Sequence, residues 1–307
     1  MRALAKYGSR IAVTLIPVVL ALLHATGVAP IGVLPRLDNI IYDARLRATM
    51  PRTLDERIVI VDIDEKSLAE HGRWPWSRNK LGQLVDGLFE QHQIALLGFD
   101  VVFAEADESS GLARLNELAR TELKDHPGFF QRVRQLQFAL DYDGVFSTAL
   151  EKRPVVLGYY LTSDRDGRTS GVLPAPVISR EALGGRTIPA TSWNGYGANI
   201  KTLATAAPMA GFFNSITDGD GVERSLPLLA EYQGQHYESI ALAMFRALAG
   251  SPGLAPGFSN VDERGATLVP FRGPGGAAVL SMLVGLNFWL YLSSVVSQRS
   301  SEESELI

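Results

Sequence analysis

The residues best suited to chemistry stand between positions 57 and 78, where acids follow a β-branched apolar run and precede an aromatic loop. The run at residues 58–63 predicts a short buried strand. Carboxylates at a strand end can hold a hard cation, and an arginine near a helix start can bind an anion. A second strand predicted at residues 94–102 ends beside another aspartate. The candidate ligand-binding residues are therefore Asp62, Asp64, Glu65, Trp74, Trp76, Arg78 and Asp100.

Each of these residues also has a structural interpretation. Asp64 can cap a turn, Arg78 can pair with Asp62 or Asp100, and the Trp-Pro-Trp loop can close one end of the sheet. The pair Asp62 and Asp64 resembles the acids of haloacid-dehalogenase phosphatases, but Lys66 stands where those enzymes need Thr or Val. One alternative function stays open, a periplasmic metal-dependent hydrolase that uses Asp62, Asp64 and Asp100.

The segment Asp218-Gly219-Asp220-Gly221 looks like part of a calcium loop. It lacks the third acid and the downstream glutamate of an EF-hand, so a glycine-rich turn explains it as well. Asp218 and Asp220 are therefore only weak metal candidates. The five histidines stand singly, without zinc-ligand spacing. No nucleophile elbow, Walker loop or dinucleotide fingerprint occurs, and the sequence predicts neither a catalytic residue nor a cofactor.

Composition narrows the functional class. The chain has 307 residues with 46% hydrophobic and 20% charged residues, which suffices for a folded core. Its net charge of −4 argues against a nucleic-acid-binding protein, which needs a basic face. It has no cysteine, so disulfides and thiolate metal sites are excluded.

Two apolar segments have the length of membrane spans. Residues 11–34 contain no Asp, Glu, Lys or Arg, and Arg2, Lys6 and Arg10 precede them. This pattern predicts a span with residues 1–10 in the cytoplasm, and a signal peptide cleaved near Ala25 is the rival interpretation. Residues 277–296 predict a second span, with a buried core helix as the rival, and residues 297–307 a cytoplasmic tail. Residues 35–276 would then form an extracytoplasmic domain at a bacterial inner membrane.

Between the spans, the hydrophobic pattern predicts an α/β fold with a mixed, largely parallel sheet flanked by helices. Residues 162–208 read as loops with short strands. A hairpin turn is expected at Gln233-Gly234. Helices are predicted at 37–47, 79–91, 111–124, 130–140, 141–152 and 239–249. Strands are predicted at 58–63, 94–102, 155–161, 211–215, 222–232, 235–237 and 266–271.

Several ordered motifs between residues 37 and 275 resemble the type 2 CHASE domain, an extracytoplasmic sensory module of bacterial adenylate cyclases, histidine kinases and Ser/Thr kinases. The most specific of them is Gly72-Arg73-Trp74-Pro75-Trp76-Ser77-Arg78. The other matching segments are Tyr42-Asp43-Ala44-Arg45, residues 58–67, Gly98-Phe99-Asp100, Phe103-Ala104-Glu105, residues 211–214, residues 218–224 and residues 271–275.

The resemblance implies a sensor for transmembrane signalling, the input part of a cyclase-type or kinase-type receptor, and no enzyme activity for this chain. It implies a small-molecule or ion signal and a membrane partner. A third interpretation of the chain is a purely structural interaction module that forms a homodimer through its helices. Family members continue after the Arg-Gly-Pro motif with a further strand-helix section, three spans and an effector. Here Gly276 leads directly into an apolar segment, so we expect the end of the sensor fold and the effector to be missing.

Overall fold

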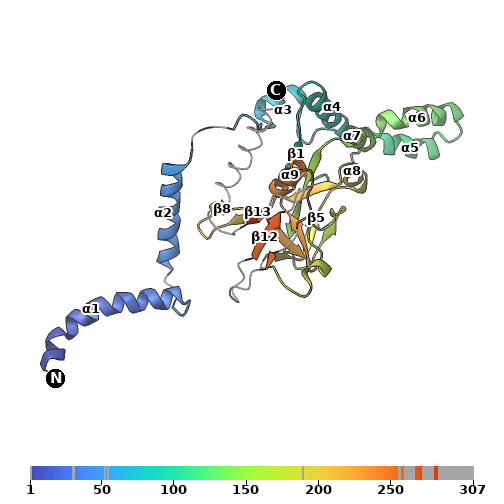
Figure 1. The fold of residues 1–307 in the computed structure, drawn as a ribbon. Helices are drawn as coiled ribbons and strands as arrows, with labels where there is room; N and C mark the ends of the chain where they lie inside the picture. Colours follow the sequence, from blue (N-terminus) through green and yellow to red (C-terminus); the bar gives the residue numbers. More distant parts are fainter. Residues whose placement is uncertain are drawn as a thin grey trace, which may run out of the picture. The chain divides into compact units, whose positions relative to one another are not determined.

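The computed structural model describes residues 2–29, 32–51, 53, 55–188, 190–254, 257–258, 267–271 and 280–282. The chain divides into two compact units, Met1–Ile63 and Asp64–Ile307. Figure 1 shows the helices of the first unit and the α/β body of the second.

The first unit contains two helices, α1 (Arg2–Ala25) and α2 (Val33–Thr49). The predicted helix at residues 37–47 is confirmed as part of α2. The apolar segment 11–34 is not one continuous helix, because α1 ends at Ala25 and α2 begins at Val33, with Gly27 between them at a φ of 74°. In the part of the chain that the structure describes, no helix is both long and apolar enough to cross a membrane.

The strand predicted at residues 58–63 is wrong. This stretch has no regular secondary structure, and Ile60 is 88% exposed. Its β-branched residues favour an extended chain, but a strand also needs a neighbour for its backbone groups, and no pairing with this stretch occurs among the described residues. Sequence pattern identified strand-forming residues here without identifying a partner strand.

The second unit is built on a five-stranded mixed sheet with β2 (Val155–Thr162) at its centre. The first half of β2 runs parallel to β1 (Leu97–Phe99) on one side and to β6 (Met209–Phe212) on the other. Its last three residues pair antiparallel with β5 (Gly195–Gly197), which also pairs with β3 (Thr169–Ser170). Three of the four strand pairs of this sheet are parallel and one is antiparallel, so the sheet is mixed and largely parallel, as the sequence predicts.

Helices predicted from their apolar spacing are confirmed with small changes at their ends. Among the described α-helices of this unit, only α3 and α8 were not predicted. The helices of this unit are α3 (Glu65–His71), α4 (Arg78–Glu90), α5 (Leu112–Arg120), α6 (Pro127–Leu140), α7 (Tyr142–Leu150), α8 (Lys201–Ala206), α9 (Ile240–Leu248) and the 3-10 turn η1 (Glu181–Leu183).

A smaller sheet places β9 (Leu229–Tyr232) between β10 (Gln235–Glu238) and β4 (Thr191–Trp193). The hairpin of β9 and β10 confirms the predicted turn, in which Gln233 and Gly234 both have positive φ. A second hairpin pairs β7 (Ile216–Thr217) with β8 (Glu223–Ser225).

The last described strands are β11 (Gly257–Phe258), β12 (Thr267–Phe271) and β13 (Leu280–Met282). β12 agrees with the strand predicted at residues 266–271. β13 falls inside the predicted span at residues 277–296, and these three residues are strand rather than helix because their backbone pairs with β12. The remainder of that predicted span, and the tail at residues 297–307, lie outside the described residues.

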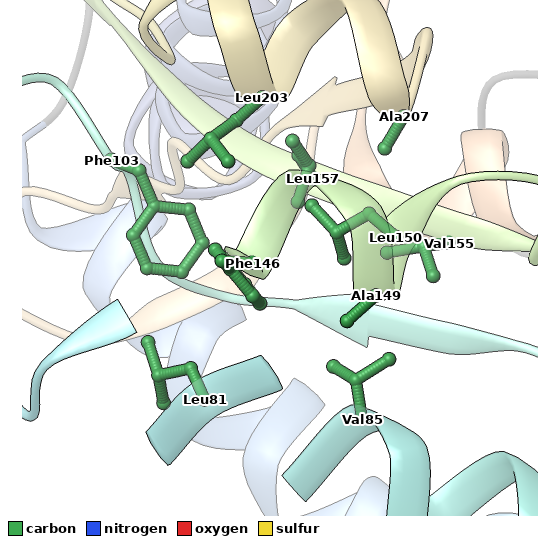
Figure 2. Packing of buried hydrophobic residues seen from close by; sticks show 10 residues of the cluster. All are labelled: Leu81, Val85, Phe103, Phe146, Ala149, Leu150, Val155, Leu157, Leu203 and Ala207. Carbon is green, nitrogen blue, oxygen red and sulfur yellow. The ribbon is translucent and has the colours of Figure 1, made fainter. Parts of the chain in front are cut away.

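The main core fills the space between the sheet and the helices α4, α7 and α8. Figure 2 shows ten of its side chains, eight from β2, α4, α7 and α8 together with Phe103 after β1 and Ala207 after α8. The rings of Phe103 and Phe146 meet edge to face at a centroid distance of 5.2 Å. Leu150, Val155 and Leu157 are almost fully buried around them. Burying a side chain of this size stabilises the fold by about 1.5–3 kcal/mol, so this layer fixes how α4, α7 and α8 sit on β2.

Candidate functional site

A cavity of about 160 Å³ lies on the face of the five-stranded sheet beside α8. Its walls come from β2, from the chain before β4, from α8 and from the start of β6. The lining residues are Leu157, Tyr159, Val172, Leu173, Pro174, Ala175, Asn199, Ala204, Thr205, Ala207, Pro208 and Ala210. We call this space the α8 cavity.

The floor of the α8 cavity is rigid because hydrogen bonds hold it from both sides. Asn199 is only 2% exposed, and its Nδ2 donates to the Gly158 carbonyl of β2 at 2.9 Å. Its Oδ1 accepts a hydrogen bond from the Phe103 backbone N–H at 2.8 Å. The Ile200 N–H donates to the Phe103 carbonyl, also at 2.8 Å. Both ends of the Asn199 amide thus link β2 to the chain that follows β1.

The wall formed by residues 172–175 depends on a close backbone approach. The Val172 N–H donates to the Asn199 carbonyl at 2.9 Å. Gly171 has a φ of 72°, and a Cβ built on it would lie 2.0 Å from the Ala198 carbonyl oxygen. Only glycine combines that dihedral angle with that contact. Gly171 therefore sets the position of the wall over the floor.

The chemistry of the lining favours an uncharged ligand. Among the described residues, those that line the α8 cavity carry no charge, and most are aliphatic. The pocket is partly open to solvent, and its volume of about 160 Å³ is enough for a molecule of about the size of benzene. The polar lining residues are Tyr159, Asn199 and Thr205, and a few polar groups suffice to orient a ligand in an apolar pocket. The α8 cavity suits a small neutral molecule better than a metabolite with carboxylates or phosphates.

The sequence-predicted residues lie elsewhere. Asp64 caps α3, since its Oδ1 accepts hydrogen bonds from the Ser67 N–H at 2.8 Å and the Ser67 hydroxyl at 2.6 Å. These bonds lower the pKa of Asp64 below its ordinary value. Glu65 and Asp100 are exposed, and Asp62 belongs to the first unit. None of these acids lines the α8 cavity.

The aromatic loop at residues 74–76 is held largely by contacts among its own residues and with the residues just before it. The Trp76 Nε1 donates to the Gly72 carbonyl at 2.7 Å, and its ring meets those of His71 and Trp74 edge on. Trp76 also packs against the main core, while Trp74 remains partly exposed. Trp74 is therefore the ring of this loop that stays open to a partner.

Arg78 is engaged by three groups and not by the acids that the sequence suggested. Its Nε donates to Asp143 Oδ1 at 3.2 Å, its Nη2 donates to the Glu105 carbonyl at 2.8 Å, and its guanidinium lies over the Phe103 ring at 4.4 Å. The partner is thus Asp143 of α7 instead of Asp62 or Asp100. That Arg78, Trp74, Trp76 and the four acids bind a ligand stays a prediction.

The two aspartates of the 218–221 turn, Asp218 and Asp220, bind the Arg224 side chain. Arg224 donates to Asp218 Oδ2 and to both carboxylate oxygens of Asp220, each at 2.8 Å. The hydrogen bond from Arg224 lowers the pKa of Asp220 to about 2. In the described part of the chain no three His, Asp or Glu side chains gather as a metal site requires.

Sequence reasoning missed the α8 cavity. Its residues come mainly from the region 162–208, which showed no clear pattern. Asn199 gave no signal, since its partners Phe103 and Gly158 stand far away in the sequence. Tyr159 lies between the cavity and a tyrosine cluster with Tyr196, Tyr232 and Tyr237. Burial raises the pKa of the Tyr159 hydroxyl well above 10, so the side chain is neutral in the folded protein.

Comparison with known proteins provides the family. No curated protein and no solved structure matches the chain significantly. The family model of the CHASE2 domain matches residues 13–298. This match covers nearly the whole chain and includes every motif on which the resemblance was based. The chain therefore belongs to the CHASE2 domain family, whose members are extracellular sensory domains rather than catalytic ones.

Proposed function

We propose that this chain is the signal-input domain of a bacterial transmembrane receptor. The observation that carries the proposal is the CHASE2 match over residues 13–298. The proposed effector is an adenylate cyclase or a protein kinase, as the family resemblance implies. We propose no catalytic activity for the chain itself.

The proposed topology places residues 35–276 in the periplasm, with apolar segments 11–34 and 277–296 as anchors. Support comes from the sequence alone, in which both segments have the length of a span and Arg2, Lys6 and Arg10 precede the first; in the structure α1 ends at Ala25 and β13 lies within the second segment. Alkaline phosphatase and green fluorescent protein fused in turn after Lys152 test this topology. Phosphatase activity without fluorescence is expected. Fluorescence without phosphatase activity would place the domain in the cytoplasm and refute the proposal.

The proposed signal is a small uncharged molecule that binds in the α8 cavity. This cavity lies between a fixed strand, β2, and the short helix α8, whose only nearly fully buried side chain is Leu203. A ligand would add contacts to α8 that the empty protein lacks. Ligand binding to the folded state raises the melting temperature, so thermal shift measures it directly.

The decisive experiment screens the full chain in detergent against small neutral molecules and charged metabolites, and then fills the cavity. Ala204→Phe occupies the α8 cavity, while Thr202→Phe adds the same ring to an exposed position of α8 that does not line it. A neutral hit should stabilise the parent chain and Thr202→Phe but not Ala204→Phe. A hit that stabilises all three equally, or stabilisation only by charged metabolites, would rule out this site.

A further inference from the structure

The helix α6 (Pro127–Leu140) is the least buried long helix of the second unit. Val133 is its only fully buried side chain, and Phe129 and Leu140 are half-buried. It packs mainly against α5, and the hairpin of these two helices projects beyond α4 and α7 (Figure 1). Most of the α6 surface therefore faces away from the body of the domain.

Three exposed residues of α6 form a stripe along that outer surface. Phe130, Arg134 and Phe138 follow each other at intervals of four, which places them on one side of a helix with 3.6 residues per turn. Phe138 is 87% exposed, and the Arg134 guanidinium lies 5.6 Å from the centre of the Phe130 ring. We call these three residues the α6 stripe. The Phe138 ring exposes apolar surface to water, and burying this ring against a partner would be favourable.

The charge of α6 has one sign. The helix contains Arg132 and Arg134 and no acid. In the described part of the chain neither arginine forms an ion pair: Arg132 donates to Gln135 Oε1 at 3.1 Å, and Arg134 contacts only the Phe130 ring. Arg134 lies within the α6 stripe and is thus available to an anionic partner beside the exposed aromatic rings, whereas Arg132, two positions after Phe130, lies on the other side of the helix.

A second copy of this chain fits the α6 stripe poorly. Two α6 helices packed antiparallel about a two-fold axis would place Phe130 against Phe138 of the other copy, but would bring the two Arg134 side chains together at the centre. Like charges in contact oppose such an interface. An anionic lipid surface has no such conflict, because it offers headgroups to arginine and acyl chains to phenylalanine. We propose that the α6 stripe docks on an anionic phospholipid surface.

Single-cysteine labelling tests this directly, since the chain has no cysteine of its own. Gln131→Cys places an environment-sensitive fluorophore beside Arg134 and Phe138 without removing any stripe residue. Ala139→Cys, five positions after Arg134, places the same label on the opposite side of the exposed surface. Each full-length variant is reconstituted into vesicles of phosphatidylcholine, with or without phosphatidylglycerol, and lipids with spin labels serve as quenchers.

We expect a blue shift and quenching for the Gln131→Cys label in phosphatidylglycerol vesicles, and neither for the Ala139→Cys label. Phe138→Ser in the Gln131→Cys background should weaken docking by about tenfold or more, because one aromatic ring leaves the lipid. Arg134→Gln should weaken it about fivefold, and added salt should do the same. Circular dichroism confirms that the variants stay folded.

Three outcomes would overturn the proposal. The absence of a blue shift and of quenching at both label positions would show that α6 does not touch lipid. The same shift in pure phosphatidylcholine would remove the role of the arginines. A shift that grows with the protein-to-lipid ratio would assign the α6 stripe to a protein contact. None of these results bears on ligand binding in the α8 cavity, so the two proposals can fail separately.

Discussion

Arg78 and Asp143 form an ion pair at 3.2 Å between the first residue of α4 and the first turn of α7. The two side chains are 12% and 13% exposed. Asp143 Oδ2 also accepts from the Asp107 N–H at 2.9 Å, and Asp107 Oδ2 accepts from the Arg78 N–H at 2.6 Å. Asp107 thus caps α4, while Ser77 at the N-cap position makes no side-chain cap bond. One small network therefore holds two helix starts together.

The first prediction concerns this network. Arg78→Ala should lower the free energy of unfolding by roughly 2–4 kcal/mol, because it removes the countercharge of the mostly buried Asp143 carboxylate and a donor to the Glu105 carbonyl. Arg114→Ala is the matched control, since its ion pair with Glu117 is exposed and should contribute less than about 0.5 kcal/mol. Denaturant melts of both variants give the comparison. Equal effects would mean that burial adds nothing to the Arg78 pair.

The second prediction concerns Asn199. Replacing it by Ala removes both hydrogen bonds of its side chain and strands the Phe103 N–H and the Gly158 carbonyl, so we expect a loss of about 2–4 kcal/mol. Asn194→Ala is the control, because Asn194 Nδ2 makes one exposed bond to the Asp164 carbonyl and should lose about 1 kcal/mol or less. Thermal denaturation measures both. A stable Asn199→Ala variant would show that the floor of the α8 cavity does not depend on this amide.

Gly171 gives the third prediction. Gly171→Ala should destabilise the protein by at least about 2 kcal/mol, since the new Cβ meets the Ala198 carbonyl oxygen and the backbone has positive φ. Gly184 also has positive φ, at 57°, but a Cβ there meets no atom within 4 Å. Gly184→Ala should therefore cost only about 1 kcal/mol. A comparable loss in both variants would assign the effect to backbone conformation alone.

The fourth prediction is a pH dependence from His236, which is 3% exposed. Burial lowers the pKa of His236 below 6.5, against smaller opposing effects of the Ile188 backbone and Glu231. As the pH falls below about 6.5, the unfolded chain binds a proton that the folded protein does not, so stability decreases towards the lowered pKa. Burial raises the pKa of Glu238, because it disfavours the charged carboxylate, while the hydrogen bond and the charge of Arg246 lower that pKa by a smaller amount.

The contribution of His236 is isolated by difference. His236→Gln keeps a polar side chain of similar size but removes the titration. The gap in melting temperature between the parent chain and His236→Gln should therefore narrow, or turn in favour of the variant, between pH 7 and 5.5. His126→Gln, at an exposed position, is the control. A pH-independent gap would show that His236 does not titrate differently in the folded and unfolded states.

Local pattern was a good guide to elements whose signal lies in a few consecutive residues. The apolar spacing of α4, α6 and α9 and the glycine turn between β9 and β10 were read directly. The strand expected at residues 58–63 failed because strand formation depends on a partner, which a run of β-branched residues does not specify.

The candidate site was harder to predict because its contacts join distant residues. The sequence placed Arg78 near Asp62 or Asp100 by proximity along the chain, whereas the fold provides Asp143, which lies 65 positions away. The α8 cavity is lined by β2 and by residues 172–175 and 199–210. Its small apolar side chains cannot be distinguished in the sequence from those of an ordinary hydrophobic core. A cavity is defined by what the packing leaves empty, and no residue type marks that in advance.

The pairing of β2 limits how the domain can respond. Leu97–Phe99, Met209–Phe212 and Gly195–Gly197 together hold β2 along its whole length. Sliding this strand by one residue would break all three ladders and turn its core side chains to the wrong face. β2 is therefore a fixed reference for the domain. If a ligand binds in the α8 cavity, we expect α8 and residues 172–175 to move, because β2 cannot. A conformational change would then be transmitted through these two segments and not through the sheet.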